Sequence, residues 1–503
     1  MRWPDYAILA LYFGSILYLG FRHRRQETSA DYYLAGRRLS GLLTGISVTV
    51  TLISAISFMG SAAFVFAHDL TLMLGMLATP FTIPVVNGVI LPFYHRLPIT
   101  TGYEYLERRF NVALRSIAST LFILLRLFYL AVVIYAPAVA LAVVTGWPIY
   151  RSIVLMGGVS VALACLGGMR GVISAEVIKF AALLTSIVAI LAVVAANLDG
   201  GFTRAYEIAR DGGRLHTFEW SLDPTVTFSV WATIIGSFFQ NVSSYGADQI
   251  TIQRYLTSSS TEESRRAYTF CAWATIPINV LLGLIGLGMY VYYQQHPSEL
   301  GSLATSDYVL PYFAVHRLPT GVAGLVIATI FSMSLTTHSS GLHSVNTAIM
   351  NDFFQRFLRP GEDTRYYVRV ARVGTVVWGA LTTVLAFYIS GLGMIAIAAK
   401  KINLFFGGVL LGIFLLGMLS RRAGSAGALL GALTGISAVA VVGQYTAASF
   451  FWYGPLGCLV TMTAGYLFGL LFPAPDQARI RGFHLERRAE SAAIALQGSL
   501  PDD

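Results

Sequence analysis

The chain has 503 residues, of which 55% are hydrophobic and only 12% are charged. This composition excludes an ordinary soluble globular protein, in which about a quarter of the residues are charged. The net charge of +9 does not indicate nucleic acid binding, because the Arg residues fall in short runs between apolar segments. Cys165, Cys271 and Cys458 lie within apolar segments without metal-ligand spacing, which indicates small packing residues.

Apolar segments long enough to cross about 30 Å of hydrocarbon recur along nearly the whole chain. Only helices satisfy their own backbone groups in lipid when no β-barrel alternation is present, so the predicted fold class is an all-α membrane protein. The first segment is followed by Arg22, without a small-residue cleavage site, and is interpreted as a retained helix. Thirteen transmembrane helices are expected, at residues 5–21, 42–68, 70–94, 116–145, 149–167, 172–197, 225–253, 267–293, 321–350, 368–389, 392–419, 423–446 and 452–472.

Arg-rich and Arg-poor connections alternate along the chain. The positive-inside rule therefore predicts a multi-pass protein of the inner (plasma) membrane, with the N-terminus outside and the C-terminus cytoplasmic. Membrane lipid and a small-molecule solute are the expected partners, and neither nucleic acid nor an obligate protein partner is indicated.

Two of the predicted spans carry polar residues where a lipid-facing helix should be apolar. One lies at 44–68 and includes Ser47, Thr51 and Ser54, and the other contains Gln240 to Gln249. Small residues that let helices pack closely would explain either span alone. If the ten spans after the first form two sets of five, both polar spans come first in their set. Symporters with inverted repeats place their discontinuous helices at such matching positions, which favours an unwound binding site.

The expected organisation divides the chain into six parts. These are a first helix and cytoplasmic linker at 1–41, inverted repeat 1 at 42–197, an external loop at 198–224, inverted repeat 2 at 225–419, two C-terminal helices at 420–472 and a cytoplasmic tail at 473–503.

Six short stretches, in this order, resemble the sodium:solute symporter family over nearly the whole chain. The resemblance is nearest to its monocarboxylate, vitamin and iodide carriers, and it implies five-plus-five inverted helices, one helix before them, two after them and alternating access. The stretches are Asp31-Tyr-Tyr-Leu-Ala-Gly-Arg-Arg38, Ile53-Ser-Ala-Ile-Ser-Phe-Met-Gly60, Ile134-Tyr-Ala-Pro-Ala138, Gly167-Gly-Met-Arg-Gly-Val172, Tyr245-Gly-Ala-Asp-Gln249 with Gln253-Arg-Tyr-Leu256, and Gly407-Gly-Val-Leu-Leu-Gly412.

A hydroxyl-rich stretch at 331–344 is the candidate sodium site, because a sodium ion needs about five or six oxygen ligands. By resemblance, Thr336 and Thr337 match the family's paired hydroxyl ligands and Met333 its carbonyl ligand. The unwound part of the first polar span would add carbonyls from Val50 and Ile53. Hydroxyls that bond back to carbonyls four residues earlier would explain one or two of these residues, but not the whole run.

Some family members have a second sodium position, and the resemblance assigns its acid to Glu176 and its hydroxyls to Ser339 and Ser340. Here Lys179 lies three residues after Glu176, on the same helical face. We expect its ammonium to take the place of the second ion, so that one sodium is coupled per cycle. A water-exposed ion pair near the cytoplasmic end of the helix is the alternative, and proton coupling through Glu176 stays open.

Arg126 lies about ten residues into an otherwise apolar span, with Tyr129 one turn further on the same face. A guanidinium at that depth is costly unless it faces a cavity or a partner, which makes it a functional candidate. Its bidentate donors suit a carboxylate. The alternatives are snorkelling towards the cytoplasmic surface and pairing with a cytoplasmic acid.

The remaining wall of the solute site is predicted by resemblance and by position in the two polar spans, with one residue from the tenth helix of the repeats. These residues are Ser54, Ser57, Phe58, Gln240, Asn241, Ser244, Tyr245 and Asn403.

The function that these features predict is sodium-coupled secondary active symport, with a sodium ion as the coupling ion. The expected cargo is a small organic anion, such as a monocarboxylate or a sialic-acid-like solute. A sodium/sugar symporter, a proton-coupled carrier and a non-translocating sensor are the alternatives. An enzyme is not expected, because no Ser/His/Asp, HExxH or phosphate-loop arrangement occurs.

Overall fold

The computed structural model describes residues 1–22, 41–97, 99, 102–166, 169–256, 260–480 and 482–485. These residues form helices joined by short connections, with no strand among them, so the all-α fold class is confirmed for the described part of the chain. The stretch at 31–38, most of the predicted linker and the tail from 486 onward lie outside the described residues.

In the described part of the chain, ten long helices make up most of the bundle, and each corresponds to a predicted span. Nine helical stretches within the described ranges are long and apolar enough to cross a membrane, and a bent helix pair supplies a tenth. The number thirteen stays a prediction. The long helices are α1 (Trp3–Arg22), α8 (Val112–Thr145), α9 (Ile149–Leu166), α10 (Met169–Ala196), α14 (Thr261–Gln295), α16 (Val322–Ile349), α17 (Thr364–Ala386), α18 (Ile395–Leu419), α19 (Ser425–Tyr445) and α20 (Tyr453–Leu471).

One further stretch, from residue 71 to residue 96, winds irregularly. Proline removes a backbone donor, and Pro80, Pro84 and Pro92 are spaced along it, so the regular hydrogen-bond ladder is not maintained. The segments in order are η2 (Thr71–Ala78), α5 (Thr79–Val85), η3 (Val86–Ile90) and α6 (Leu91–Arg96), of which η2 is 3-10 and η3 is π-helical. A second π-helical segment, η6 (Met350–Leu358), extends α16.

Both spans predicted to be discontinuous are interrupted. The first is divided into α3 (Gly41–Leu52) and α4 (Ala55–Ala67), which meet at 55°. The side chain of Ser54 caps α4 by accepting a hydrogen bond from the Ile56 amide at 3.3 Å. The second is divided into α12 (Val230–Gly246) and α13 (Gln249–Leu256), and the Asp248 carboxylate accepts from the Ile250 amide at 2.9 Å. A capping side chain at each break supplies an acceptor that the interrupted helix lacks.

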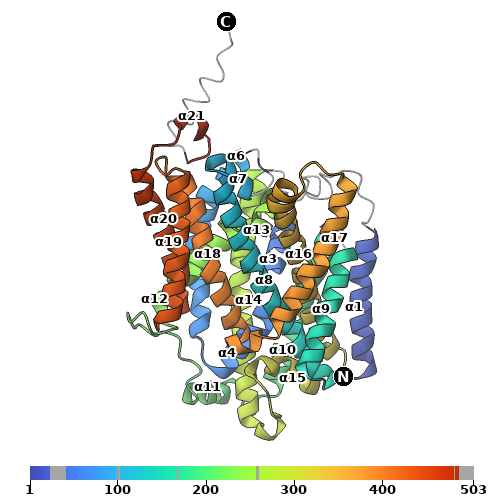
Figure 1. Ribbon diagram of the computed structural model, residues 1–503. Helices are drawn as coiled ribbons and strands as arrows, with labels where there is room; N and C mark the ends of the chain where they lie inside the picture. The colour runs from blue at the N-terminus through green and yellow to red at the C-terminus, as the bar shows by residue number, and fades with distance from the viewer. Residues whose placement is uncertain are drawn as a thin grey trace.

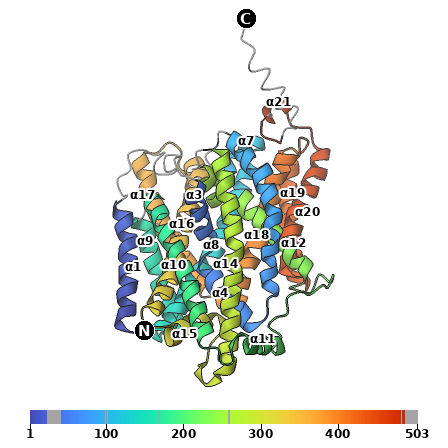
Figure 2. The ribbon, with the colours of Figure 1, turned by 180° about the vertical axis from the view of Figure 1, so that it is seen from behind.

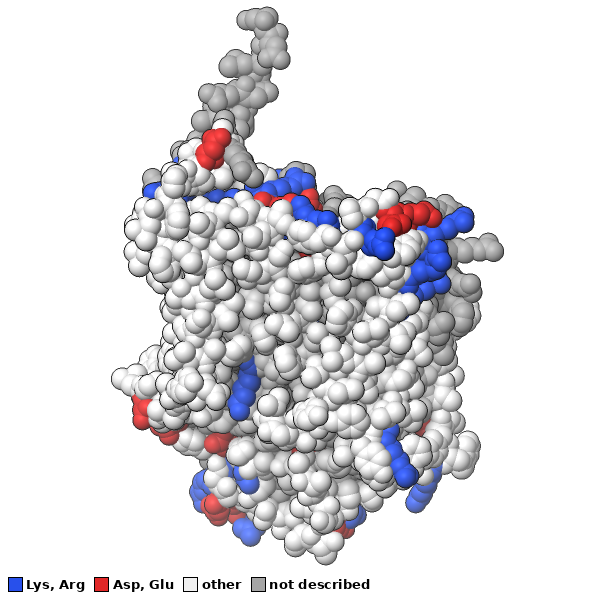
Figure 3. Space-filling view, viewed as in Figure 1, with Lys and Arg blue, Asp and Glu red and all other residues white. Residues whose placement is uncertain are grey.

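The two ends of the bundle differ in composition from its middle. The N-terminus, α11 (Gly201–Asp211) and α15 (Val309–Arg317) lie at one end, and α7 (Gly102–Arg109) and α21 (Gln477–Ile480) lie at the other (Figures 1 and 2). Charged side chains gather at both ends and are sparse across the band between them (Figure 3). This distribution is typical of a protein whose middle faces lipid tails.

Helix α8 runs through the centre of the bundle and packs against α4, α9, α16, α17 and α18. Its middle is buried almost without interruption from Leu130 to Ala140. A polar side chain on this part of α8 therefore contacts protein groups rather than lipid. Helix α8 is thus well placed to line a binding site inside the bundle.

Candidate functional site

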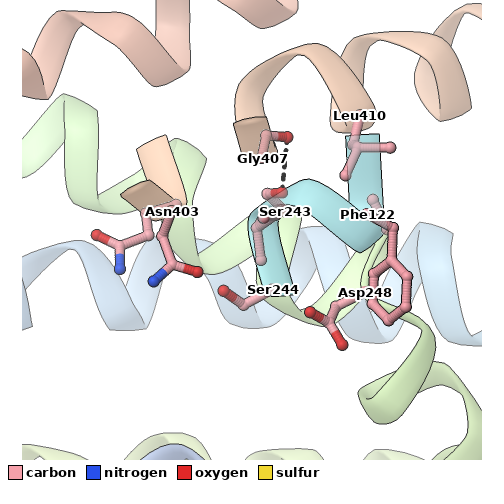
Figure 4. A pocket seen from close by; sticks show the side chains of 10 residues that line it. Phe122, Ser243, Ser244, Asp248, Asn403, Gly407 and Leu410 are labelled. Atoms are coloured by element: carbon pink, nitrogen blue, oxygen red, sulfur yellow. Dashed lines mark hydrogen bonds between the residues drawn. The ribbon is translucent and has the colours of Figure 1, made fainter. Parts of the chain in front are cut away.

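A pocket lies between α8, the end of α12 and α18 (Figure 4). Apolar side chains of α8 and α18 form one part of its wall, and amide, hydroxyl and carboxylate groups form the rest. Such a mixture, with few polar groups in a mostly apolar wall, is typical of small-molecule sites. The lining residues are Phe122, Leu125, Gln240, Ser243, Ser244, Ala247, Asp248, Asn403, Gly407 and Leu410.

The wall between α12 and α18 is closed by one hydrogen bond. The Ser243 hydroxyl donates to the Gly407 carbonyl at 2.7 Å, as the dashed line in Figure 4 shows. A Cβ added at Gly407 would lie 2.8 Å from the Ser243 oxygen, so glycine permits this close approach. The first residues of the Gly407-Gly motif therefore have a packing role at the edge of the pocket.

Arg126 forms an ion pair with Asp248, which lies in the break between α12 and α13. The two side chains are only 13% and 11% exposed. The guanidinium also lies 5.6 Å from the Phe122 ring and 5.8 Å from the Tyr129 ring. One alternative for Arg126 was pairing with a cytoplasmic acid. The acid that it pairs with, Asp248, lies in the break of a helix and is largely buried.

Tyr129 connects the same face of α8 to the other broken helix. Its side chain lies near that of Ser54, which caps α4, where α8 packs against α4. Arg126 and Tyr129 are three residues apart, so a single turn of α8 contacts both breaks.

Three buried polar atoms around this pair have no hydrogen-bond partner among the described residues. They are the Nε of Arg126, the Oε1 of Gln240 and the hydroxyl oxygen of Tyr103 on α7. Tyr103 is 2% exposed, and its ring centroid lies 5.5 Å from that of Phe122, the ring that the Arg126 guanidinium also approaches. Buried polar groups are normally satisfied, so unpartnered ones beside a pocket indicate a place for water or a polar ligand.

The structure brings together three of the predicted solute residues, Gln240, Ser244 and Asn403, on the pocket wall. Asn403 also donates to the Ala399 carbonyl at 2.8 Å. The others lie outside the lining: Ser57 and Asn241 are half-buried, Phe58 is 0% exposed, and Tyr245 packs on Tyr268 with ring centroids 4.5 Å apart.

The predicted sodium ligands lie on α16 and beside the first break, and α16 packs against both α3 and α4. Thr336 donates to the Ser332 carbonyl at 2.7 Å, and Thr337 donates to the Met333 carbonyl at 2.7 Å. These are the hydrogen bonds to carbonyls four residues earlier that were the alternative explanation for the hydroxyl-rich stretch. They use only the hydroxyl hydrogens, so the lone pairs on both oxygens stay available to a cation. Val50 and Ile53 are 4% and 3% exposed.

The residues of the predicted second ion position are buried as well. Glu176 is 4% exposed and Lys179 is 1% exposed, so the water-exposed ion pair at the cytoplasmic end was wrong: packing by α3 and α16 covers this face of α10. The Thr51 hydroxyl on α3 donates to the Ser47 carbonyl at 2.8 Å and lies 3.5 Å from the Glu176 carboxylate, which places α10 beside the first broken helix. Ser339 and Ser340 are half-buried on α16, and Ser340 donates to the Thr337 carbonyl at 3.1 Å.

Comparison with known proteins identifies the class to which this fold and site belong. A family model described as the Sodium:solute symporter family matches residues 32–435. The chain belongs to this family.

Several individual members of this family are similar to the chain over most of its length. The chain is 31% identical to the sodium/sialic acid symporter NanT of Aliivibrio fischeri, over 93% of each chain. It is 30% identical to the sodium/sialic acid symporter SiaT of Proteus mirabilis, over 94% of this chain and 96% of the relative. It is also 30% identical to human sodium-coupled monocarboxylate transporter 1, over 84% of this chain and 69% of the relative.

Solved structures agree with these matches. A substrate-bound, outward-open Na+-coupled sialic acid symporter superposes with a TM-score of 0.84 at 29% identity, covering 95% of this chain and 99% of that one. Mhp1, a nucleobase-cation-symport-1 transporter, superposes with a TM-score of 0.60 at 13% identity, covering 91% of this chain and 99% of that one, which shows a shared fold.

Sequence reasoning missed part of the pocket. Phe122, Leu125 and Leu410 look like ordinary residues of an apolar span, and no pattern distinguishes them. Asp248 did carry a signal, because an acid within a predicted span is a functional candidate with a partner to be found.

Proposed function

We propose that this chain imports a small organic anion with a carboxylate group, of the sialic acid or monocarboxylate kind, in symport with sodium. The observation that carries the proposal is the Arg126 guanidinium, buried beside the pocket with an unpartnered Nε. A guanidinium fork matches a carboxylate in geometry and charge. Membership of the family supports sodium as the coupling ion, and the relatives' solutes support the class of cargo.

The proposed architecture has thirteen spans in the inner membrane, with residues 42–197 and 225–419 as two inverted repeats of five helices. The interruptions of α3/α4 and α12/α13, each the first span of its set, support this division. The N-terminus lies outside and the C-terminus in the cytoplasm, with 1–41, 198–224, 420–472 and 473–503 as the remaining parts. Alternation of the Arg-rich connections supports that orientation.

The proposed sodium site uses the hydroxyl oxygens of Thr336 and Thr337 with the carbonyls of Met333, Val50 and Ile53. Burial of the three carbonyl-bearing residues supports it, since a low dielectric strengthens each ligand dipole. Lys179 occupies the second ion position beside Glu176, Ser339 and Ser340, so that one sodium is coupled per cycle. The burial of Lys179 and Glu176 away from water supports that assignment.

A neutral polyol, such as a sugar, is a second candidate cargo. The polar groups that line the pocket are amides, hydroxyls and the Asp248 carboxylate, while Arg126 is not among the lining residues. Sugar hydroxyls can donate to such acceptors and accept from the amide groups.

A thermal-shift screen of the purified protein separates these candidates. N-acetylneuraminate, lactate and glucose are each added in sodium and, as the ionic control, in potassium. We expect the unfolding temperature to rise with a carboxylate in sodium only, because a ligand that binds the folded state stabilises it by mass action. A shift with glucose alone would favour the polyol, and equal shifts in potassium would contradict sodium coupling.

A further inference from the structure

The Arg126–Asp248 ion pair joins the centre of α8 to a break in another helix. Asp248 is the last residue before α13, and one of its carboxylate oxygens holds the Ile250 amide while the other meets Arg126. Asp248 is one of the residues that line the pocket, as Figure 4 shows, whereas Arg126 is not among them. A solute in this pocket therefore meets the acid first.

This order of contacts opposes an anionic solute. Asp248 neutralises Arg126 and presents a negative charge to the pocket, and like charges brought together in a poorly hydrated site repel one another. An organic anion can pair with the Arg126 guanidinium only if the ion pair between Arg126 and Asp248 breaks. We propose that Asp248 is an internal counter-ion, which occupies Arg126 in the empty carrier and is replaced there by the carboxylate of the solute. This inference rests on the proposed function.

The surroundings favour such an exchange. The unpartnered Nε of Arg126 and the unpartnered hydroxyl of Tyr103 are two donors that Asp248 leaves unused. Both donors lie around Phe122, because the Tyr103 ring and the Arg126 guanidinium lie 5.5 Å and 5.6 Å from that ring. A solute carboxylate that replaced Asp248 would meet them there. The released Asp248 keeps the Ile250 amide and the positive end of the α13 dipole, which stabilise its charge.

The exchange also acts on the second broken helix. The break is held by the Tyr94 hydroxyl, which donates to the Gly246 carbonyl at 2.6 Å, by the Gln249 side chain, which accepts from the Gly102 amide at 2.8 Å, and by Arg126. Of these three ties, only the one to Arg126 borders the pocket. Binding of an anion therefore frees the break from α8 while leaving its contacts with α6 and α7 in place.

Asp248→Asn tests the proposal, because asparagine caps a helix as well as aspartate does but carries no charge. Isothermal titration in sodium measures the Kd of N-acetylneuraminate and of its uncharged methyl ester. We expect the Kd of the acid to fall about tenfold in this variant, which corresponds to one close charge pair, and the Kd of the ester to stay the same. Asp223→Asn is the matched control and should change neither value, because it is an acid-to-amide change at an exposed residue whose carboxylate likewise accepts from the amide two residues later, that of Thr225.

An unchanged or higher Kd of the acid in Asp248→Asn would overturn the counter-ion role, and so would an equal gain for the ester. If Asp248→Asn does not fold, as judged by gel filtration, Asp248→Ser retains a capping oxygen without charge and should give the same gain. Failure of the wild-type protein to bind any carboxylate in sodium would instead overturn the proposed function, and the counter-ion role with it.

Discussion

Arg126 and Tyr129 lie one turn apart on α8, and each reaches a different broken helix. Arg126 is paired with Asp248 between α12 and α13, and Tyr129 lies near Ser54 between α3 and α4. Because one helix lies beside both interruptions, a solute that engaged Arg126 would act on the same turn of α8 that lies beside the break with the proposed sodium ligands Val50 and Ile53.

Replacement of Arg126 should remove the binding of organic anions. In Arg126→Gln the carboxylate of the solute loses its charged donor, and truncating a buried charge partner costs about 2 kcal/mol or more, which raises the Kd about 30-fold. Titration of N-acetylneuraminate in sodium measures this change. The double variant Arg126→Gln/Asp248→Asn leaves no unpaired charge and controls for misfolding, so normal affinity in either variant would contradict the role of Arg126.

The hydroxyl of Thr337 is predicted to bind sodium. In Thr337→Ala one oxygen ligand is lost, and a contact to a charged group is worth about 1.5 kcal/mol or more. The sodium concentration that half-saturates uptake should therefore rise about tenfold. Thr347→Ala removes an exposed hydroxyl from the same helix and should leave this value unchanged. Equal effects of the two substitutions would show that Thr337 is a packing residue.

Lys179 is predicted to set the number of sodium ions. Removing its charge in Lys179→Gln leaves Glu176 able to hold a cation, so the Hill slope of uptake against sodium concentration should rise from about one towards two. Initial uptake rates in proteoliposomes at a series of sodium concentrations give the slope. Lys401→Gln, at an exposed position on α18, is the control. A slope that Lys179→Gln leaves unchanged refutes the assignment.

Asp307, in the segment η5 (Ser306–Tyr308) outside the spans, makes stability depend on pH. Its carboxylate accepts from the Ile395 amide at 3.1 Å, at the start of α18. Burial raises the pKa of Asp307 to about 6, although that hydrogen bond lowers it, against 3.8 for an ordinary aspartate.

Between pH 3.8 and about pH 6, the Asp307 carboxyl keeps its proton in the folded state but has lost it in the unfolded state. The contribution of Asp307 to the free energy of unfolding is therefore fully present below about pH 4, and it falls by about 3 kcal/mol as pH rises through 6. Asp307→Asn lacks this titration, so its unfolding temperature relative to wild type should rise between pH 4.5 and pH 7.5. Thermal unfolding in detergent at both pH values measures the difference, and a difference that does not change with pH contradicts the prediction.

Much of the fold could be predicted because the bilayer imposes a strong rule on sequence. A long run of apolar residues indicates a membrane-spanning helix. Polar residues within such a run indicate a place where the backbone does not face lipid, and both helix breaks were predicted from this signal. The hydroxyl run around Thr336 and the isolated Arg126 were visible for the same reason.

The composition of the site could be predicted only in part. The pairing of Arg126 with Asp248 joins residues far apart in the chain, and such contacts depend on how the helices pack. Phe58 and Tyr245 were placed in the wall by their position in the broken helices, but the direction of a side chain depends on helix rotation, and both are buried in packing contacts instead. The bonds from Thr336 and Thr337 to carbonyls were a local pattern that sequence could anticipate.

Uptake of labelled N-acetylneuraminate into proteoliposomes tests most directly whether sodium drives the accumulation of a carboxylate solute bound through Arg126. It is measured with an inward sodium gradient or with equal sodium on both sides, for the wild-type protein and Arg126→Gln. We expect transient accumulation above the external concentration in the wild-type protein with the gradient only, and none in Arg126→Gln. Equal uptake with and without the gradient, or full accumulation by Arg126→Gln, would contradict it.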